Sequence, residues 1–219
     1  MMTPRMPSPI GHALAGVAVV WTADLVDGRR SSPRLVATCA GLAMLPDADL
    51  LIPWTHRMAT HSLVAAAAVF IVTAVVTGEV TPRSGRSGGS GRSGGSGRSG
   101  VSGVRHLNAA TQAWRTAILC TLAYASHLLL DWLGADDSPP RGLQLLWPFS
   151  NRWMISDWDI FRQTARHHFL TAPIVWQNTI AVAQEIAILL PIVLALWLVR
   201  VKAAPRFSTE LAGSDHPAQ

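Results

Sequence analysis

HRMATHSLVAAAAVFIVTAVV (residues 56–76) joins two histidines and an arginine directly to an apolar run that is long enough to enter a membrane. Residues 62–78 contain no Asp, Glu, Lys or Arg. A membrane-spanning helix needs about 17 to 25 mainly apolar residues, so this run predicts such a helix. The side chains of His56, Arg57 and His61 would then lie at one end of it, at the membrane surface.

The composition is typical of a membrane protein. Hydrophobic residues make up 49% of the 219-residue chain and charged residues only 14%, and the apolar residues are gathered in long blocks. The net charge is +5, but the arginines are spread over connecting segments rather than along one amphipathic helix, so we expect no nucleic-acid partner. Cys39 and Cys120 both lie in apolar segments without a C-x-x-C spacing, and we expect both to be buried.

Further apolar segments indicate an all-α fold. Residues 179–199 are a second clear spanning candidate, and three segments with polar residues near one end are less pure. These three are residues 10–26, 35–52 and 113–133. We therefore predict a polytopic membrane helical bundle of about five apolar helices.

A repeated Arg-Ser-Gly unit divides the chain. Residues 83–105 contain almost no apolar side chain, which predicts a flexible linker without a packed core. Residues 1–82 would hold helices one to three with the His/Asp motifs, and residues 106–201 would hold helices four and five with a Trp-rich interfacial segment. Residues 202–219 are expected to be a disordered tail.

The basic residues predict the orientation of the bundle. Arginine and lysine are concentrated at residues 29–34, in the linker and after residue 199, which we expect to be cytoplasmic. The helices then alternate so that every candidate ligand lies on the other side. We predict a multi-pass protein of the plasma (inner) membrane with its site on the extracytoplasmic side.

SHLLLD (residues 126–131) is the first part of this site. His127 and Asp131 are four residues apart, so on a helix they project from one face, one turn apart. Such a pair is often only hydrogen-bonded, but it also has the spacing to share a metal ion. Burial at the end of an apolar helix favours a functional role, because an ionisable pair is costly there.

LPDADLLIP (residues 45–53) places two carboxylates between two prolines. Pro46 should end the preceding helix and leave Asp47 and Asp49 on an irregular turn at the membrane surface. The turn is either solvated, with an aspartate as a helix cap, or it supplies oxygen ligands to a divalent cation.

The histidines that precede the apolar run complete the pattern. His56 and His61 are five residues apart, or ~140° around a helix, so at least one of them should lie in a loop. Taken alone, His12, which follows Gly11, is the weakest candidate for a metal ligand. Each could be an ordinary interfacial histidine. Since three separate outer helix ends carry His and Asp, we favour a shared metal site.

The motifs GH (11–12), LPDAD (45–49), HRMATHSL (56–63), YASHLLLDWLG (124–134) and GLQLLWP (142–148) resemble the YdjM-like family of membrane-bound, metal-dependent hydrolases. Their order is also similar to that of zinc-dependent phospholipase C and related single-strand nucleases. The second resemblance implies metal-binding roles for the following residues: His12, Asp47, His61, His127 and Asp131. The sequence differs from those enzymes further along, where this chain has the adjacent pair His167 and His168 instead of a His-x-x-x-Glu. One or two ions are therefore expected rather than three.

These features predict a hydrolase. The candidate metal ligands are His12, Asp47, His56, His61, His127 and Asp131, and the candidate catalytic residues are Asp49 and Arg57. The ion would be divalent, with Zn²⁺ favoured over Mn²⁺ or Fe²⁺, and would lower the pKa of its water toward ~7. Arg57 would bind a phosphate or contact lipid headgroups, and Asp49 would bind metal, orient a histidine or accept a proton.

The expected substrate is a phosphoester or ester of a membrane lipid or a lipid-linked molecule, because the ligands lie where the apolar runs stop. Tryptophans between helices four and five indicate an interfacial segment over the site. Asp157 and Asp159 in that segment are expected to be solvated or paired with Arg162, or to be late ligands. The alternative is a non-catalytic metal-binding transporter or regulatory partner with the same ligands.

Overall fold

The computed structural model describes residues 5–51, 57–80, 99–137, 139–165 and 171–212. The elements follow in the order β1 (Arg5–Met6), α1 (Pro9–Val26), α2 (Pro33–Met44), the 3-10 helix η1 (Leu45–Leu51), α3 (Leu63–Val80), α4 (Ser99–Leu133), β2 (Thr164–Ala165) and α5 (Ala172–Ala212). Among these residues the only sheet is the two-residue antiparallel ladder of β1 and β2. The predicted all-α class is confirmed.

Three helices are long and apolar enough to cross a membrane: Pro9–Val26, Ala109–Leu133 and Ala172–Lys202. Leu63–Gly78 in α3 is a shorter apolar helix. The prediction of one apolar helix over residues 35–52 is wrong, because α2 ends at Met44 and continues as η1. Pro46 has no N–H to donate and its ring obstructs the preceding turn, so the α-helix stops there.

Serine and proline begin two of these helices. Ser8 caps α1 by accepting a hydrogen bond from Gly11 N, and Pro9 follows at the first helical position. Ser32 caps α2 by accepting from Leu35 N, and Pro33 follows it. Pro is favoured at this position because the N–H it lacks has no partner within the helix.

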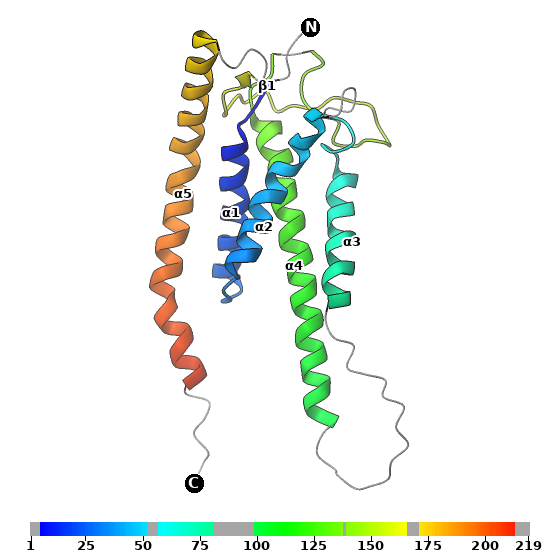
Figure 1. The fold of residues 1–219 in the computed structure, drawn as a ribbon, viewed down its shortest axis with the longest axis vertical. Coiled ribbons are helices and arrows are strands. Elements are labelled where there is room, and N and C mark those ends of the chain that lie inside the picture. The colour runs from blue at the N-terminus through cyan, green and yellow to red at the C-terminus, as the bar shows by residue number, and fades with distance from the viewer. Residues whose placement is uncertain (1–4, 52–56, 81–98, 138, 166–170, 213–219) are drawn as a thin grey trace.

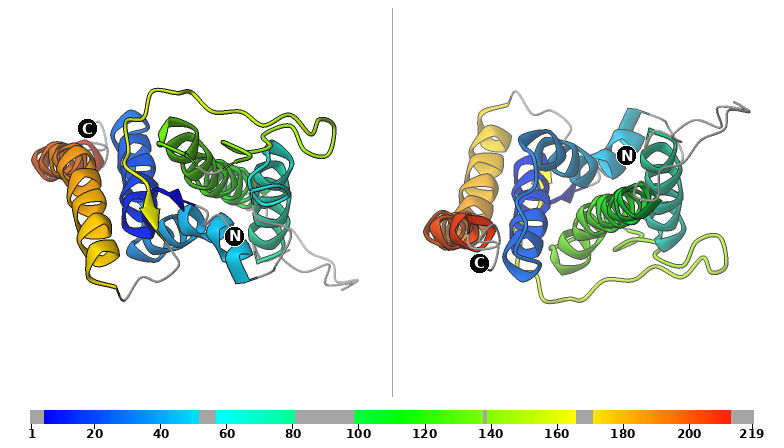
Figure 2. Two further views of the ribbon diagram at one scale, coloured as in Figure 1. Left: turned by 90° about the horizontal axis from the view of Figure 1, so that it is seen from above. Right: turned by 90° about the horizontal axis from the view of Figure 1, so that it is seen from below.

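The helices run alternately up and down (Figure 1). α4 packs against α1, α2 and α3, and α5 packs against the other side of α1 (Figure 2). Gly16 permits close approach of α1 to α2, since a Cβ there would lie 2.7 Å from the Cys39 carbonyl oxygen. Cys39 and Cys120 are free and buried in the same core cluster, as expected from the sequence.

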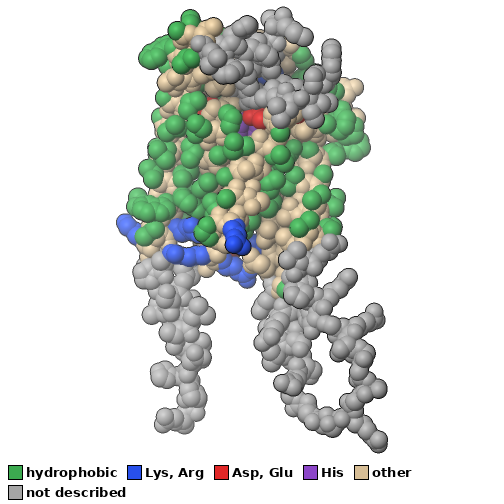
Figure 3. Space-filling model, in the orientation of Figure 1, with side chains coloured by type: hydrophobic (Ala, Val, Ile, Leu, Met, Phe, Trp, Pro, Cys, Tyr) green, Lys and Arg blue, Asp and Glu red, His purple; other side chains and the backbone are tan. Residues whose placement is uncertain are grey.

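An ion-pair network joins three helices at the end opposite the histidines. Asp24 of α1 is buried and pairs with Arg115 of α4 at 2.8 Å and with Arg200 of α5 at 2.9 Å. Asp24 also accepts hydrogen bonds from the N–H and hydroxyl of Ser31. Lysine and arginine gather at this lower border of the apolar surface (Figure 3), as the predicted cytoplasmic side requires.

The segment between α4 and α5 crosses the helix ends at which the histidines lie (Figure 2). These are called the outer ends, after the predicted orientation. The segment contacts the end of α4 through hydrogen bonds from Ser156 N to Trp132 O and from Ile160 N to Leu133 O. Leu145 O accepts a hydrogen bond from Leu63 N at the start of α3. Trp158 in this segment and Trp176 on α5 are largely exposed. This position agrees with the predicted interfacial segment.

Two boundaries differ from those expected. α4 begins at Ser99, within the range assigned to the linker, and α5 continues to Ala212, beyond residue 201. The two helices therefore continue past their apolar parts. Only the apolar part of each helix is suited to span a membrane. The rest of the linker and residues 213–219 lie outside the described residues.

The orientation is testable by cysteine labelling. Phe149, on the outer segment, is 87% exposed, and Arg29 is exposed at the opposite end. We expect Phe149→Cys to react with a membrane-impermeant maleimide in intact spheroplasts, and Arg29→Cys to react only after lysis. The native chain is the control, because both native cysteines are buried. The reverse pattern of labelling would invert the proposed topology.

Candidate metal centre

Six predicted site residues meet at the outer end of the bundle. All six are buried in the structure: His12, Asp47, Asp49, His61, His127 and Asp131. His56, also predicted as a ligand, lies outside the described residues, as do His167 and His168.

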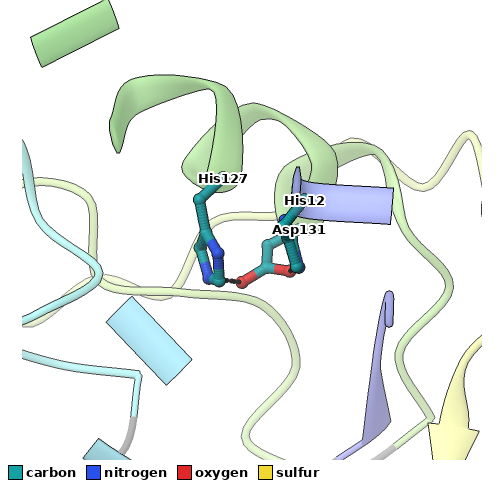
Figure 4. Close-up of side chains that lie close together, drawn as sticks. All are labelled: His12, His127 and Asp131. Atoms are coloured by element: carbon teal, nitrogen blue, oxygen red, sulfur yellow. Dashed lines mark ion pairs between the residues drawn. The ribbon is translucent and has the colours of Figure 1, made fainter. Parts of the chain in front are cut away.

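Each residue is placed by the end of a helix. His12 is in the first turn of α1, and His127 and Asp131 lie one turn apart near the end of α4 (Figure 4). Asp47 and Asp49 project from η1, where Pro46 has interrupted the α-helix. The centre is thus built where four segments reach the same level.

His61 lies in a turn immediately before α3. The Tyr124 hydroxyl of α4 donates a 2.5 Å hydrogen bond to the carbonyl of Thr60, which fixes this turn against α4. Ser62 accepts a hydrogen bond from Ala65 N and so caps α3. This position agrees with the expectation that at least one of His56 and His61 lies in a loop.

Three ligand atoms form a nearly equilateral triangle. His61 Nε2 and His127 Nε2 are 3.2 Å apart, and Asp131 Oδ2 lies 3.3 Å from the first and 3.1 Å from the second. Two nitrogens bound to one tetrahedral Zn²⁺ would be about 3.3 Å apart, given Zn–N bonds of about 2.0 to 2.1 Å. The spacing of these three atoms therefore fits a single small cation.

His12 and Asp47 extend this triangle on two sides. His12 Nε2 lies 3.4 Å from Asp131 Oδ1, and its ring stacks on His127 with centroids 3.8 Å apart. Asp47 Oδ1 lies 3.8 Å from His127 Nε2. Two sets of residues are close enough to hold an ion: His12, His127 and Asp131, and Asp47, His61 and His127.

Some of these polar atoms lack a hydrogen-bond partner among the described residues. Neither ring nitrogen of His12 makes one, and neither do the two carboxylate oxygens of Asp131, although the groups face each other. Leaving buried polar groups unsatisfied is costly. A divalent cation bound between them would satisfy both, so the residues present fit a metal ion.

The hydrogen bonds behind two histidines orient them as ligands. His127 Nδ1–H donates a hydrogen bond of 2.8 Å to the carbonyl oxygen of Ala43, which leaves the Nε2 lone pair facing the centre. His61 Nδ1 lies 3.0 Å from the Thr60 hydroxyl and 3.3 Å from Asp49 Oδ2, so its Nε2 also faces the centre. Partners of this kind fix the tautomer of metal-binding histidines.

Asp49 lies behind His61. Its Oδ2 also accepts hydrogen bonds from the Thr60 hydroxyl at 2.6 Å and from Arg57 N at 3.1 Å. Of the three roles considered for Asp49, this arrangement favours orientation of a histidine. A catalytic role for Asp49 stays a prediction.

The carboxylates also change the acid–base behaviour of His61. Burial lowers the pKa of its imidazole, but hydrogen bonds to Asp131 and Asp49 raise it more, so that the pKa is about 9. The two carboxylates therefore stabilise either a proton or a metal cation on this imidazole.

Arg57 lies beside the centre and is held by a residue that the sequence analysis did not select. Its side chain is buried and pairs with Asp136 at 2.5 Å, so the guanidinium is held inside the protein. Asp136 Oδ2 also accepts a hydrogen bond from Gly142 N at 2.7 Å. Arg57 adopts a φ of 66°, a left-handed backbone conformation that is uncommon outside glycine.

A narrow cleft connects Arg57 with the ligands. It is lined by Pro7, Arg57, Asp131, Ala135, Asp136, Gly142 and Leu143. Arg57 and Asp131 therefore face a common space, in which an anionic group near the metal ligands could contact a guanidinium.

Glu185 is the second residue that the sequence analysis missed. It is fully buried in α5, and its carboxylate accepts hydrogen bonds from Ser8 N at 2.7 Å and from the Ser8 hydroxyl. A carboxylate is favoured at a helix N-terminus, so this contact holds the start of α1, and with it His12. An acidic residue inside an apolar helix was the signal that could have identified it.

Asp157 and Asp159 are not part of the centre. Both are exposed on the outer segment, in agreement with the solvated alternative. Asp157 pairs with Arg141 at 2.9 Å, so the expected pairing of Asp157 with Arg162 is wrong.

Comparison with known proteins agrees with this membrane architecture. The family model described as "YdjM inner membrane protein" matches residues 6–204 of the chain. No curated protein and no solved structure matches it. The matched range contains all five helices up to residue 204 and every described member of the candidate centre.

Metal content tests the centre directly. We expect the detergent-purified chain to bind one or two equivalents of Zn²⁺, measured by inductively coupled plasma mass spectrometry. His127→Ala and Asp131→Ala should each abolish stoichiometric binding, because each removes a corner of the ligand triangle. Asp157→Ala, which removes an exposed carboxylate from the same end of the molecule, is the matched control and should retain the metal. Absence of metal from the native chain after zinc supplementation would contradict the assignment.

The role of Glu185 is testable by a double-mutant cycle. Glu185→Ala should cost about 1 to 3 kcal/mol, because it leaves the buried Ser8 donors without an acceptor. Gly11→Ala should also destabilise the protein, since the added methyl would lie 2.6 Å from Glu185 Oε2. In the double variant the steric conflict is absent, so we expect its free energy of unfolding to exceed the additive value by about 0.5 kcal/mol or more. Additive losses in denaturant unfolding would show that the carboxylate does not hold α1.

Proposed function

We propose that this chain, which belongs to the YdjM inner membrane protein family, is a metal-dependent hydrolase that cleaves a phosphoester or ester of a membrane lipid or lipid-linked molecule. The observation that carries the proposal is the buried triangle of His61 Nε2, His127 Nε2 and Asp131 Oδ2. A narrow cleft lined by Asp131 and Arg57 places a guanidinium beside this triangle, where it could contact an anionic group.

The donor set supports zinc. Two imidazole nitrogens and one carboxylate oxygen are the ligands of many catalytic zinc sites, which keep a further position open for water or substrate. Mn²⁺ and Fe²⁺ also bind mixed imidazole and carboxylate sets, so they remain the alternatives. Asp131 offers one oxygen to the triangle and the other to His12, which is compatible with one ion or with two.

A bound divalent ion would supply Lewis-acid polarisation and a water of lowered pKa, about 7 for Zn²⁺. The contributions of the chain itself are separate. Arg57 would bind a phosphate oxygen and compensate negative charge that develops during the reaction. Asp136 would hold the Arg57 guanidinium in place, and Asp49 would hold His61.

The position of the centre supports a lipid substrate. Its ligands lie at the outer ends of α1 and α4, which are apolar below this level. The exposed tryptophans Trp158 and Trp176 lie at the same end, where aromatic residues mark the boundary between headgroups and acyl chains. An ester at the headgroup level would meet the centre without leaving the membrane.

The distribution of ionisable residues argues against a transporter. In the described parts of the spanning helices, most of the buried ones lie near the ends: His12, His127 and Asp131 at the outer end, and Asp24 at the inner end. Glu185 lies near the middle of the span Ala172–Lys202, but its carboxylate is bound to Ser8. A transporter instead carries polar groups at the middle of several helices. A non-catalytic metal-binding protein is the remaining alternative, and turnover separates the two.

The proposal predicts chelator-sensitive hydrolysis. A panel of phosphomonoester, phosphodiester and carboxylic ester lipids in mixed micelles should contain a substrate whose turnover EDTA abolishes and Zn²⁺ restores. Arg57→Gln should lower kcat for a phosphoester by about 10²-fold or more, because it removes a donor to developing charge. Arg152→Gln, at an exposed outer arginine, should leave kcat unchanged.

Two results would contradict this function. Turnover that persists in EDTA or in His127→Ala would place the chemistry elsewhere. A fully metal-loaded protein without turnover on the whole panel would favour the non-catalytic alternative.

A further inference from the structure

A second cavity lies beside the candidate metal centre, at the outer end of α5. Its volume is about 380 Å³, within the range of about 300 to 1,000 Å³ that is usual for ligand pockets. The described residues that line it are Ala135, Arg162, Gln163, Trp176, Gln177 and Ile180. None of them is among the predicted ligands or catalytic residues.

The charge of this cavity is positive. Arg162 is the only ionisable residue among its described lining residues, and its guanidinium makes no ion pair with any residue that the structure describes. Its backbone N–H donates to Gln184, while the side chain of Gln163 is held by Asp137 at 2.6 Å. Arg162 is therefore placed to bind an anion, and a guanidinium can bind phosphate with two parallel hydrogen bonds.

The level of the cavity, at the outer end of the membrane span of α5, indicates an amphipathic ligand. Trp176 and Ile180 lie in the first turns of α5, at the outer end of the span Ala172–Lys202. Trp176 is 68% exposed, as expected for a residue at the boundary between headgroups and acyl chains. A molecule with its anion on Arg162 would thus rest its apolar part on Trp176 and Ile180.

The cavity adjoins the cleft that leads to the metal ligands. Ala135 lines both spaces, and the cleft continues from Ala135 to Asp131 and Arg57. The backbone of Ala135 is fixed by its N–H, which donates to the carbonyl of Phe161 at 2.8 Å. A ligand anchored on Arg162 would therefore lie next to the cleft that Asp131 and Arg57 line.

We propose that this cavity is the headgroup subsite for an anionic phospholipid, in which Arg162 binds the phosphate and Trp176 and Ile180 contact the start of the acyl chains. That the bound lipid is also the substrate rests on the proposed hydrolase function. The binding itself depends only on the cavity.

Lipid binding to the detergent-purified full chain tests the subsite. Native mass spectrometry would compare phosphatidic acid with phosphatidylcholine of the same acyl chains, in native protein and in Arg162→Gln. We expect native protein to bind phosphatidic acid more tightly, and Arg162→Gln to weaken that binding about tenfold or more, since a charge-assisted hydrogen bond is lost. Arg162→Lys, which keeps the charge, should restore part of the affinity.

Matched controls separate this site from general attraction to the membrane surface. Arg152→Gln removes another exposed outer arginine that lines neither cavity and should leave the affinity unchanged. Trp176→Ala should weaken binding of both lipids, whereas Trp197→Ala, an exposed tryptophan farther along α5, should not. Equal losses in Arg162→Gln and Arg152→Gln would overturn the proposal.

Two further measurements identify the source of the ligand and its link to catalysis. Millimolar inorganic phosphate should not displace phosphatidic acid, and complete displacement would indicate a free-phosphate site and overturn the lipid assignment.

Binding should persist in EDTA-treated protein and in His127→Ala, so the subsite would stand even if no turnover is found. If turnover is found, Arg162→Gln should raise KM for the anionic lipid and leave kcat unchanged, and a fall in kcat alone would overturn the substrate role.

Discussion

The carboxylate of Asp131 is the constraint on which the arrangement depends. It is buried at the outer end of α4 and lies within 3.4 Å of nitrogen atoms of three histidines from three parts of the chain. A charge buried in this way is costly unless it is paired or bound to a cation. α1, α4 and the turn before α3 must therefore end at one level, and the close helix contact at Gly16 and the anchor between Tyr124 and Thr60 bring them there.

The two ends of the bundle differ in how their buried charged groups are paired. At the inner end, the Asp24 carboxylate is satisfied by Arg115, Arg200 and Ser31, which joins α1, α4 and α5 by ion pairs and hydrogen bonds. At the outer end, His12 and Asp131 face each other without hydrogen bonds among the described residues. A satisfied network stabilises helix positions, whereas unsatisfied buried groups are found where a ligand completes them. The contact between Glu185 and Ser8 holds α1 against α5 beside His12.

Much of the fold could be predicted from the sequence. Apolar blocks identified all five helices, and the break at Pro46 correctly placed Asp47 and Asp49 outside the α-helix. The length of α2 was overestimated, because hydropathy does not distinguish an α-helix from the 3-10 helix that follows it. In the site, the pair His127 and Asp131 followed from helical spacing. Asp136 and Glu185 could not be assigned in this way, because Arg57 and Asp136 are 79 residues apart and Ser8 and Glu185 are 177 residues apart.

The sequence by itself determined a helical membrane protein with His and Asp at one set of helix ends, since hydropathy, proline and charge act over a few neighbouring residues. Only the tertiary structure decided which atoms meet. His61 and His127 are 66 residues apart in the chain, yet their Nε2 atoms lie 3.2 Å from each other. It also decided that Asp49 lies behind His61 and that Arg57 is buried against Asp136. The physical reason is that such contacts are set by how helices pack, and packing joins side chains that no local pattern relates.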